Sequence, residues 1–528
     1  MEGVDLVESG AGEDVRLAEL VAALSLGIDL GFGQPMEHVL RQCLIALRLA
    51  DLLGLDERDR AVVYYTALLV NVGCHSDAHE QAKWFGDDIA LKSGKYRYEP
   101  RSVLGAAAAL RMVGAGSPML HRFRVGLEFT LGGWREIDGM ISNHAVLARD
   151  LAGRLSLPQD VSEAVGAAYE QWDGHGWPGR LRGEQVPVAA RLAQLAEFAE
   201  VAHRIGGTRS AVEVARRRSG RQFDPHVATV LCRSPQVVFD GLEAARTWEA
   251  VISAEPALGV RLTPEQFDAA LLAVADFVDL KSPYTLGHAR AVGRLVDAAG
   301  AALDMDPGES TLLHRAALVC GLGRLGVSNA IWDKPGPLGA GEWERVRLHP
   351  YLTERMLDQS PSLAPLGAVA VQVRERLDGT GYPRGLAGGA INRPARILGA
   401  ADAYQSMIEP RAHRAALAPK QAGDLLCDEV RAGRLDAAAV AAVLDAAGER
   451  RTRARDTPGR SQGPAGLTGR EIDVLRLLAR GRSSRQIAGE LVISPKTARN
   501  HIEHIYTKTG ASSRAAACLF AVRNGLLE

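Results

Sequence analysis

The 528-residue chain has few cysteines and few aromatic residues, and it has no long apolar run. Six scattered cysteines without a CxxC pair do not make the disulfide framework of a secreted protein. The best candidate for a membrane span, 437–444, has eight residues, whereas a span needs about 18 or more. The acidic N-terminus lacks the basic and then apolar start of a secretory signal. These absences predict a cytoplasmic protein that contacts no membrane.

What is present is the composition of an ordinary soluble protein, with 47% hydrophobic and 24% charged residues, which excludes disorder as the main state. The net charge of −1 is unevenly distributed. Residues 465–528 carry ten basic and five acidic side chains, whereas the rest of the chain is acidic overall. A compact basic end predicts an anionic partner, most simply nucleic acid.

The spacing of apolar residues predicts an all-α fold. Leu40, Leu44 and Leu47 follow the three-and-four spacing of one helix face, similar stripes recur, and no regular set of alternating strands occurs. Residues 448–466 are rich in Gly, Pro, Ser and Arg without apolar periodicity, so they predict a flexible, basic linker before a C-terminal domain at 467–528.

The body upstream of this linker contains an internal repeat. The segment 172–192 matches 377–397 at a constant offset of 205 residues, including a DGxGxP motif in both copies. Further upstream the offset is 250, as between His38 and His288, so the first copy carries about 45 more residues between its matched blocks. We predict an N-terminal helical segment at 1–37 and two tandem helical modules at 38–245 and 265–447.

The second module resembles the HD-GYP phosphohydrolase family through YTLGHAR from Tyr284, KPGPLGAGEWERVRLHP from Lys334 and DGTGYPRGL from Asp378. The resemblance implies a helical bundle that hydrolyses cyclic di-GMP or a related nucleotide at a centre of two or three metals. The family's His-Asp pair, however, falls on Cys320-Gly321 and its His-His pair on Val373-Arg374. Arg374 places a permanent positive charge where a metal should sit, so we expect no two-metal hydrolysis here. The matching residues that remain are His288, His349, Glu375 and Asp402, and the family's lysine is Arg324. Of these, His288, His349 and Asp402 are the candidate metal ligands of this module.

The first module departs from the family differently. Its His-Asp pair falls on Val70-Asn71, its His-His pair on Ala168-Tyr169, and its terminal aspartate on Glu197. Beside the lost pair lies the cluster CHSDAHE, in which His75 and His79 are four residues apart and would share one face of a helix, as metal ligands do. The alternative is a polar helix end whose side chains make caps. The candidate metal ligands of this module are His38, His75, His79, Asp87, His144 and Glu197.

The two DGxGxP loops admit two interpretations. Their backbone amides can cradle phosphate, or their Gly and Pro residues serve the fold alone. The sequence leaves open whether a degenerate module still binds a nucleotide without cutting it. A divalent metal and a nucleotide are therefore the candidate ligands of the body.

The C-terminal 61 residues from Leu467 to Leu527 predict four short helices. Thr468 with Glu471 forms a capping box, Ser484 can cap a second helix, and Ser494 before Pro495 opens a third helix that runs through Lys508. Ser512 or Ser513 begins a fourth. The tight connection between the second and third helices predicts a helix-turn-helix.

This segment resembles the LuxR-type DNA-binding domain through LTGRE, GRSSRQIA and ISPKTARNHI. The resemblance implies double-stranded DNA as partner, a dimerising fourth helix, and a homodimer, with RNA polymerase and a small-molecule or nucleotide ligand as further candidates. A small basic interaction bundle that binds no DNA is the alternative. The candidate DNA-binding residues are Lys496, Thr497, Arg499, Asn500 and His501 of the third helix, and Arg485, which would hold a phosphate.

Three hypotheses follow for the whole chain. The first is a transcriptional regulator whose degenerate modules sense a ligand or partner and have no catalytic residues. The second is a metal-dependent phosphodiesterase fused to a DNA-binding domain, which intact His-Asp and His-His pairs would have favoured. The third is a protein-docking scaffold, which predicts neither metal nor small ligand.

Overall fold

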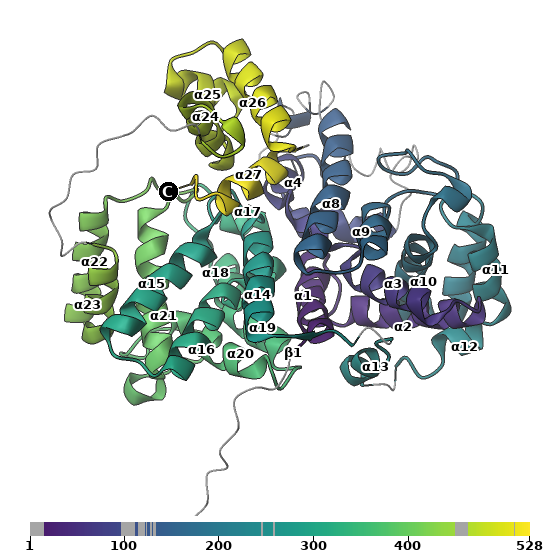
Figure 1. Ribbon diagram of the computed structural model, residues 1–528, viewed down its shortest axis with the longest axis horizontal. Helices are drawn as coiled ribbons and strands as arrows, with labels where there is room; N and C mark the ends of the chain where they lie inside the picture. Colours follow the sequence, from purple (N-terminus) through teal and green to yellow (C-terminus); the bar gives the residue numbers. More distant parts are fainter. Residues whose placement is uncertain are drawn as a thin grey trace, which may run out of the picture.

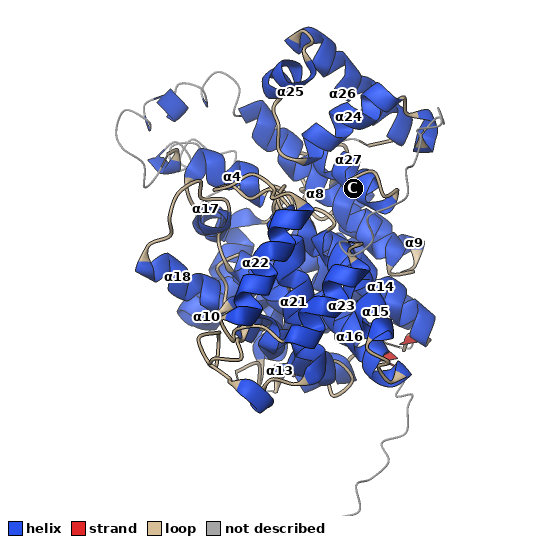
Figure 2. Ribbon diagram, turned by 90° about the vertical axis from the view of Figure 1, so that its left-hand side faces the viewer, coloured by secondary structure: helices blue, strands red, loops and turns tan. Residues whose placement is uncertain are grey.

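The computed structural model of the chain confirms the all-α prediction (Figures 1 and 2). It describes residues 15–96, 134–243, 246–256, 259–448, 463–511 and 513–527, with a few positions between 111 and 129. Over these residues the strands are limited to one short antiparallel pair, β1 (Val15–Arg16) with β2 (Arg261–Leu262), in which Val15 lies opposite Leu262. None of the helices described has the length and apolar character of a membrane span.

The N-terminal half of the body is a helical bundle. Its elements are α1 (Leu17–Gly31), α2 (His38–Leu52), α3 (Glu57–Leu69), η1 (Val72–His75), α4 (Ala78–Phe85), α5 (Asp88–Ser93), η2 (Gly94–Tyr96), α8 (Trp134–Arg154), α9 (Gln159–Gly166), η4 (Gly183–Gln185), α10 (Val188–Arg218), α11 (Pro225–Arg233), α12 (Pro235–Phe239) and α13 (Thr247–Ser253).

The second half repeats this arrangement. Its elements are α14 (Pro264–Asp279), α15 (His288–Ala302), α16 (Pro307–Val319), η5 (Leu322–Gly326), α17 (Asn329–Trp332), α18 (Ala340–Arg347), α19 (His349–Leu357), α20 (Ala364–Ala370), η6 (Val371–Arg374), η7 (Gly388–Ala390), α21 (Arg393–Ile408), α22 (Pro419–Arg431) and α23 (Ala437–Ala446).

The repeat also includes α1, although the sequence predicts that residues 1–37 lie outside the first module. Asp29 at the end of α1 accepts a hydrogen bond from the backbone N–H of Val39, at 3.0 Å. Asp279, 250 residues later at the end of α14, accepts one from the N–H of Ala289, at 2.9 Å. Helices α1 and α14 are therefore counterparts.

The two modules share a hydrophobic core, to which α1 and α14 both contribute. Helix α1 packs on α2 and α3 of its own module and also on η5 and α19 of the other. Gly27 lies so close to the second module that a Cβ there would be 2.9 Å from Leu325 Cδ1. Helix α14 in turn packs on α8, and Arg154 of α8 forms an ion pair with Asp276 at 2.6 Å. Neither first helix belongs to one module alone.

The C-terminal domain has the expected helices, η8 (Pro464–Gly466), α24 (Gly469–Ala479), α25 (Ser484–Leu491), α26 (Pro495–Thr509) and α27 (Arg514–Arg523). The capping box of Thr468 and Glu471 is confirmed, and Ser494 caps α26 by accepting the N–H of Thr497. The prediction that Ser484 caps α25 was wrong, because the N-cap is the adjacent Ser483. Only Ser483 is followed three residues later by Gln486, the partner that completes a capping box. Ser513 caps α27, whereas Ser512 and linker residues 449–462 lie outside the described residues.

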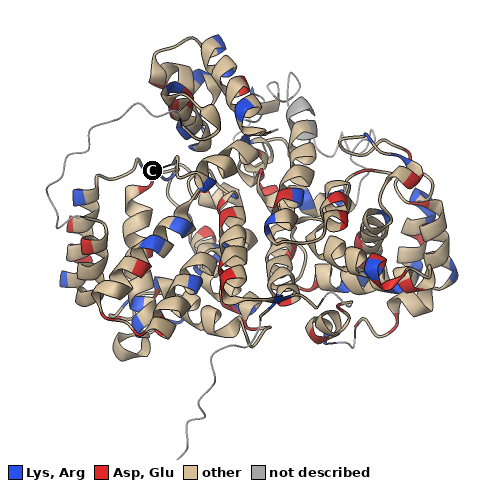
Figure 3. Ribbon diagram, viewed as in Figure 1, with Lys and Arg blue, Asp and Glu red and all other residues tan. Residues whose placement is uncertain are grey.

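The C-terminal domain sits on the body through α27, which packs on α8 and α14 (Figure 1). Charged side chains of both signs are spread over the helices of the body, and basic residues occur on the outer part of the C-terminal domain (Figure 3). The domain has its own small core, which includes Leu467, Leu475, Ile487 and Ile505.

Candidate ligand sites and nucleic-acid interface

In the second module, the carboxylate of Asp402 is surrounded by basic side chains. Arg374 Nη2 lies 2.7 Å from Asp402 Oδ2, His288 Nε2 lies 3.1 Å from Oδ1, and Arg324 Nη2 lies 4.0 Å from Oδ1. Burial alone would raise the pKa of Asp402, but Arg374, His288 and Arg324 outweigh it and hold that pKa well below its usual range. The arginine predicted from the motif therefore lies on the carboxylate that the family resemblance assigns to a metal.

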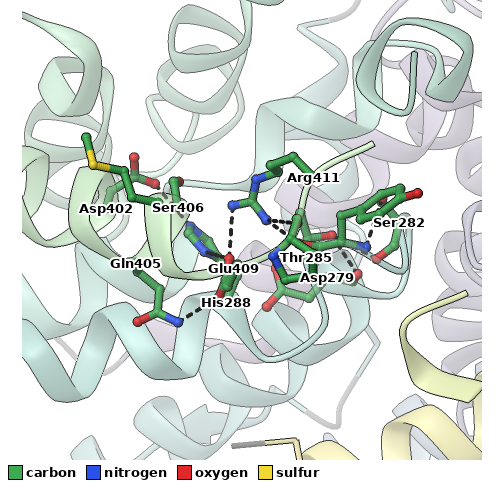
Figure 4. Close-up of polar contacts among 12 residues, drawn as sticks. Asp279, Ser282, Thr285, His288, Asp402, Gln405, Ser406, Glu409 and Arg411 are labelled. Atoms are coloured by element: carbon green, nitrogen blue, oxygen red, sulfur yellow. Dashed lines mark hydrogen bonds and ion pairs between the residues drawn. The ribbon is translucent and has the colours of Figure 1, made fainter. Parts of the chain in front are cut away.

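His288 is held between two carboxylates (Figure 4). Its Nδ1 lies 2.8 Å from Glu409 Oε2, and Arg411 and Gln405 reach the same carboxylate. Burial lowers the pKa of His288, but Glu409 and Asp402 outweigh it and raise that pKa above its usual value. An imidazole that donates from both nitrogens has no lone pair to offer a metal.

The other two matching residues of this module have different roles. His349 donates from Nδ1 to the carbonyl of Val346, and burial together with the charges of Arg324 and Arg374 lowers its pKa to about 3. Glu375 accepts hydrogen bonds from the backbone N–H groups of Arg384 and Leu386, each at 2.8 Å. Glu375 thus fastens the DGxGxP loop.

The first module places a lysine where the second has an arginine. Lys95 Nζ lies 2.5 Å from Glu197 Oε1 and donates to Asn71 Oδ1 at 3.1 Å. Asn71 and Tyr96 also donate to Glu197, at 2.7 and 2.9 Å. Burial raises the pKa of Glu197, but Lys95 outweighs it and the pKa is lowered. His38, beside this group, bonds Glu200 rather than Glu197, at 2.5 Å.

The cluster from Cys74 to Asp88 does not converge on one point. His75 contacts the carbonyls of Val72 and Phe277, and burial lowers its pKa to about 3. His79 pairs with Asp333 at 2.8 Å, and Asp87 caps α5 through the N–H groups of 89 and 90. His75 ends η1 and His79 lies in α4, so they do not share the single helix face that the spacing predicted. Asp87 makes the cap that the alternative predicts, whereas His75 is buried between the two modules.

His144 extends this group toward α8, since its Nε2 lies 2.9 Å from Asp77 Oδ2. Burial lowers the pKa of His144, while Cys74 and Asp77 outweigh it and raise the pKa. Among the described residues, no three His, Cys, Asp or Glu side chains converge as metal ligands. Because Glu197 and Asp402 are each ion-paired to a basic side chain, the donor set does not fit a two-metal centre.

The DGxGxP loops are shaped by close backbone contacts. A Cβ on Gly381 would lie 2.3 Å from the backbone nitrogen of Arg376, and one on Gly176 would lie 2.4 Å from that of Gln171. Glu170 binds the first loop as Glu375 binds the second, by accepting the N–H groups of Gly179 and Arg180. The amides that directly follow each motif are bound by glutamate, and the motif amides of Trp177 and Tyr382 donate to backbone carbonyls, which favours the structural interpretation of the motif.

The candidate DNA-binding residues lie on α25 and α26 of the C-terminal domain. Lys496, Thr497, Arg499 and Asn500 are exposed in the first two turns of α26, His501 is half-buried, and Arg485 is exposed on α25. Within the part of the chain that is described, Lys496, Arg499 and Arg485 form no ion pair. Such unpaired cations beside an open helix face are suited to phosphate and base edges.

Helix α27 has two buried faces. Ala517 and Ala521 pack into the C-terminal domain, whereas Cys518 and Leu519 belong to the core of the body. Arg523 at its end forms an ion pair with Asp150 of α8, and Arg514 lies 3.6 Å from Glu80 of α4. This interface could not be predicted from the sequence, because an apolar stripe shows that a helix face is buried but does not identify the surface that buries it.

Comparisons with known proteins agree with this architecture. Residues 135–227 and 273–439 match the family described as HD domain, and residues 465–521 match the bacterial regulatory proteins of the luxR family. The chain is 30% identical over 406 residues to "3'3'-cGAMP-specific phosphodiesterase 3" of Vibrio cholerae, a match that covers 76% of this chain and 88% of that protein. Its C-terminal part is 44% identical over 62 residues to the probable transcriptional regulatory protein NarL of Mycobacterium tuberculosis, covering 12% and 29% of the two chains.

A crystal structure of a cyclic GMP-AMP specific phosphodiesterase of V. cholerae has a similar fold, with a TM-score of 0.57 and 26% identity. The similarity covers 82% of this chain and 98% of that one.

Proposed function

This chain belongs to the HD-domain family and ends in a LuxR-family domain, and from this membership we propose that it is a DNA-binding transcriptional regulator. In this proposal the paired HD modules sense a ligand or partner and do not hydrolyse it. A role on DNA assigns the protein to the cytoplasm.

The ion pairs at the two former metal positions carry the proposal. An HD phosphodiesterase needs metals to activate water and to neutralise the phosphodiester. Here Arg374 binds Asp402 and Lys95 binds Glu197, so a basic side chain occupies the carboxylate in each module. Neither cation can activate water as a metal does, because ammonium and guanidinium groups donate hydrogen bonds and are not Lewis acids.

The DNA-binding part of the proposal is supported by α26. Its exposed Lys496, Thr497 and Arg499 have no competing ion pairs among the described residues, and Ser494 fixes the start of the helix. The LuxR-family match covers the four helices that position this surface. Contacts with RNA polymerase and formation of a homodimer are further parts of the proposal.

The test combines two measurements on the full-length protein. Selection from random duplex DNA should enrich a defined sequence, and incubation with 3'3'-cGAMP and Mn²⁺ should leave that nucleotide intact. Turnover that disappears in Asp402→Asn would instead establish the second candidate, a metal-dependent phosphodiesterase, which the long match to a phosphodiesterase favours. Absence of any selected DNA would reject the regulator.

We also propose that the body controls the DNA-binding domain through α27, whose outer face it covers. The affinity of the full-length chain for the selected DNA should differ from that of residues 463–528 alone. Equal affinities would reject this coupling.

A further inference from the structure

The first module has a cavity at the far end of α10, away from its former metal position. Glu197 and Glu200 lie in the N-terminal half of α10, and non-helical backbone at Gly206 and Gly207 interrupts the helix after them. Beyond this kink α10 packs on α11 at the outer edge of the module (Figure 1). A cavity of about 340 Å³ is lined there by Arg216, Ser219, Ala228, Thr229, Cys232 and Arg233.

The two arginines of this cavity are unpaired. Arg216 and Arg233 are exposed, and among the described residues neither side chain forms an ion pair or a hydrogen bond. Asp224, at the start of α11, is already paired with Arg191 at 2.5 Å. Glu213, one turn before Arg216, forms no ion pair with it. Since none of the described residues that line the cavity is acidic, its wall carries two positive charges and no negative one.

The rest of the wall combines hydroxyl groups with apolar surface. The half-buried Ser219 hydroxyl has no hydrogen-bond partner among the residues described, and Thr229 donates its hydroxyl to the carbonyl of Pro225 at 2.7 Å. Ala228 and Cys232 supply the apolar part. Small-molecule sites have volumes of roughly 300–1,000 Å³ and place a few polar groups on an apolar wall. This cavity is near the lower end of that range and therefore suits a small ligand.

The second module has acidic residues where this cavity has arginines. Helices α11 and α23 are counterparts, because Asp224 and Asp436 cap them and each is paired with an arginine of the long helix before. At this offset of 212 residues, Arg233 corresponds to Asp445. The last turn of α10 has three arginines, whereas that of α22 has two acidic residues and one arginine. The shared fold therefore does not require the positive charge, which belongs to the first module alone.

We propose that this cavity binds a small organic anion that carries a phosphate monoester or carboxylate group. A guanidinium matches the oxygens of either group with two parallel N–H donors. Arg216 and Arg233 donate from two different helices, the Ser219 hydroxyl supplies a further donor, and Ala228 and Cys232 lie against the carbon part. This inference rests on the proposed function, since it names the class of ligand that the body senses.

The first test uses the half-buried thiol of Cys232 as a reporter. The full-length protein is treated with iodoacetamide, and mass spectrometry follows the rate of modification at each cysteine. The probes are glycerol 3-phosphate and succinate, added in separate series. An occupied cavity should slow the modification of Cys232 in a saturable way. The exposed Cys427 of α22 is the internal control, and its rate should not change.

Variants of the two arginines test the proposed contacts. Arg216→Gln and Arg233→Gln should each raise the half-protecting concentration about tenfold, as expected for loss of a hydrogen bond to a charged group. Arg233→Asp, which introduces the charge found at position 445, should abolish the protection. Both arginines are exposed and unpaired, so these variants should fold like the wild type. The matched control Arg217→Gln removes an exposed arginine outside the cavity and should change that concentration by less than about twofold.

Calorimetric titration with the same two compounds measures binding independently of the thiol. Saturable binding of either compound that both glutamine variants weaken supports the inference, and the compound that binds shows whether phosphate or carboxylate is preferred. No binding of either compound, equal slowing at Cys427, or unchanged binding in Arg216→Gln and Arg233→Gln would overturn it. DNA selection on the same preparation separates the two proposals: absent anion binding with intact DNA selectivity rejects only this inference, whereas absence of any selected DNA rejects the proposed function.

Discussion

At the scale of single residues, each HD module pairs a buried carboxylate with a cation of the chain itself. Lys95 and Arg374 neutralise buried carboxylates that water cannot reach easily, and a buried charge is tolerated only when it is paired. A covalently attached cation does not dissociate, so the site stays assembled whatever the metal concentration.

Lys95→Met should destabilise the protein by about 3–5 kcal/mol at neutral pH, because Glu197 is left buried without its cation. In the wild type the lowered pKa of Glu197 contributes stability at neutral pH that is lost as the pH falls through that pKa. In Lys95→Met, burial raises the pKa of Glu197 instead. The difference in stability between the wild type and Lys95→Met should therefore become smaller as the pH falls toward 4.5, the ordinary pKa of a glutamate. Thermal unfolding at a series of pH values measures this difference.

The matched control is Lys95→Met combined with Glu197→Gln, which removes both charges. It should recover most of the loss at neutral pH and show little dependence on acid pH. A single variant as stable as the wild type at pH 7 would show that Lys95 does not neutralise Glu197.

Lys496→Ala should weaken DNA binding at every sequence and lower the slope of log affinity against log salt by about 1. Lys496 is exposed at the start of α26 and has no ion pair among the described residues. Lys420→Ala, on an exposed turn of α22, should leave the slope unchanged. Titration of the selected duplex at several salt concentrations measures the slope, and an unchanged slope in Lys496→Ala would remove this residue from the interface.

The sequence could predict one of the two cations and not the other. Arg374 stands at a motif position, so its charge and its location followed from the alignment of the repeat. Lys95 belongs to the extra residues of the first module, which have no counterpart in the second, and its approach to Glu197 depends on how that segment folds back.

At the scale of elements, the DGxGxP loops are kept for their backbone path. Gly381→Ala should destabilise the second module by about 1–3 kcal/mol, because its Cβ would meet backbone atoms at 2.3 Å. Gly389→Ala, in η7, meets nothing within 4 Å and should change stability by less than about 0.5 kcal/mol. Melting temperatures of the two variants make the comparison, and equal values would contradict the close-contact argument.

Helix ends were predictable where the signal is local. Thr468 and Ser494 cap their helices as expected, since a cap depends on residues three positions apart. The prediction that His75 and His79 share one helix face was wrong, because a turn separates η1 from α4. The spacing of two residues does not show whether a helix is interrupted between them.

At the scale of the whole molecule, α27 links the DNA-binding domain to the body. Leu519→Arg should weaken the contact of α27 with the body, because Leu519 lies in the core of the body. Burying a leucine contributes about 1.5–3 kcal/mol. Amide hydrogen exchange over 514–523 should speed up by about tenfold or more. Val492→Arg, on an exposed position of the same domain, should leave the exchange of α27 unchanged, and a similar rate in both variants would mean that α27 is not held by Leu519.

The fold class and the repeat were predictable from the sequence, but the interfaces were not. An apolar stripe predicts that a helix face is buried but does not identify the element that covers it. The packing of α27 on α8 and of α1 on η5 could therefore not be deduced from the sequence.

The sharing of α1 and α14 has an evolutionary consequence. A duplicated domain usually allows one copy to be lost or moved to another gene, but each copy here covers an apolar surface of the other. Deleting either copy would leave its sister with a bare hydrophobic face. Selection would therefore retain both copies together, and the two sites would be free to diverge while the pair was inherited as a unit.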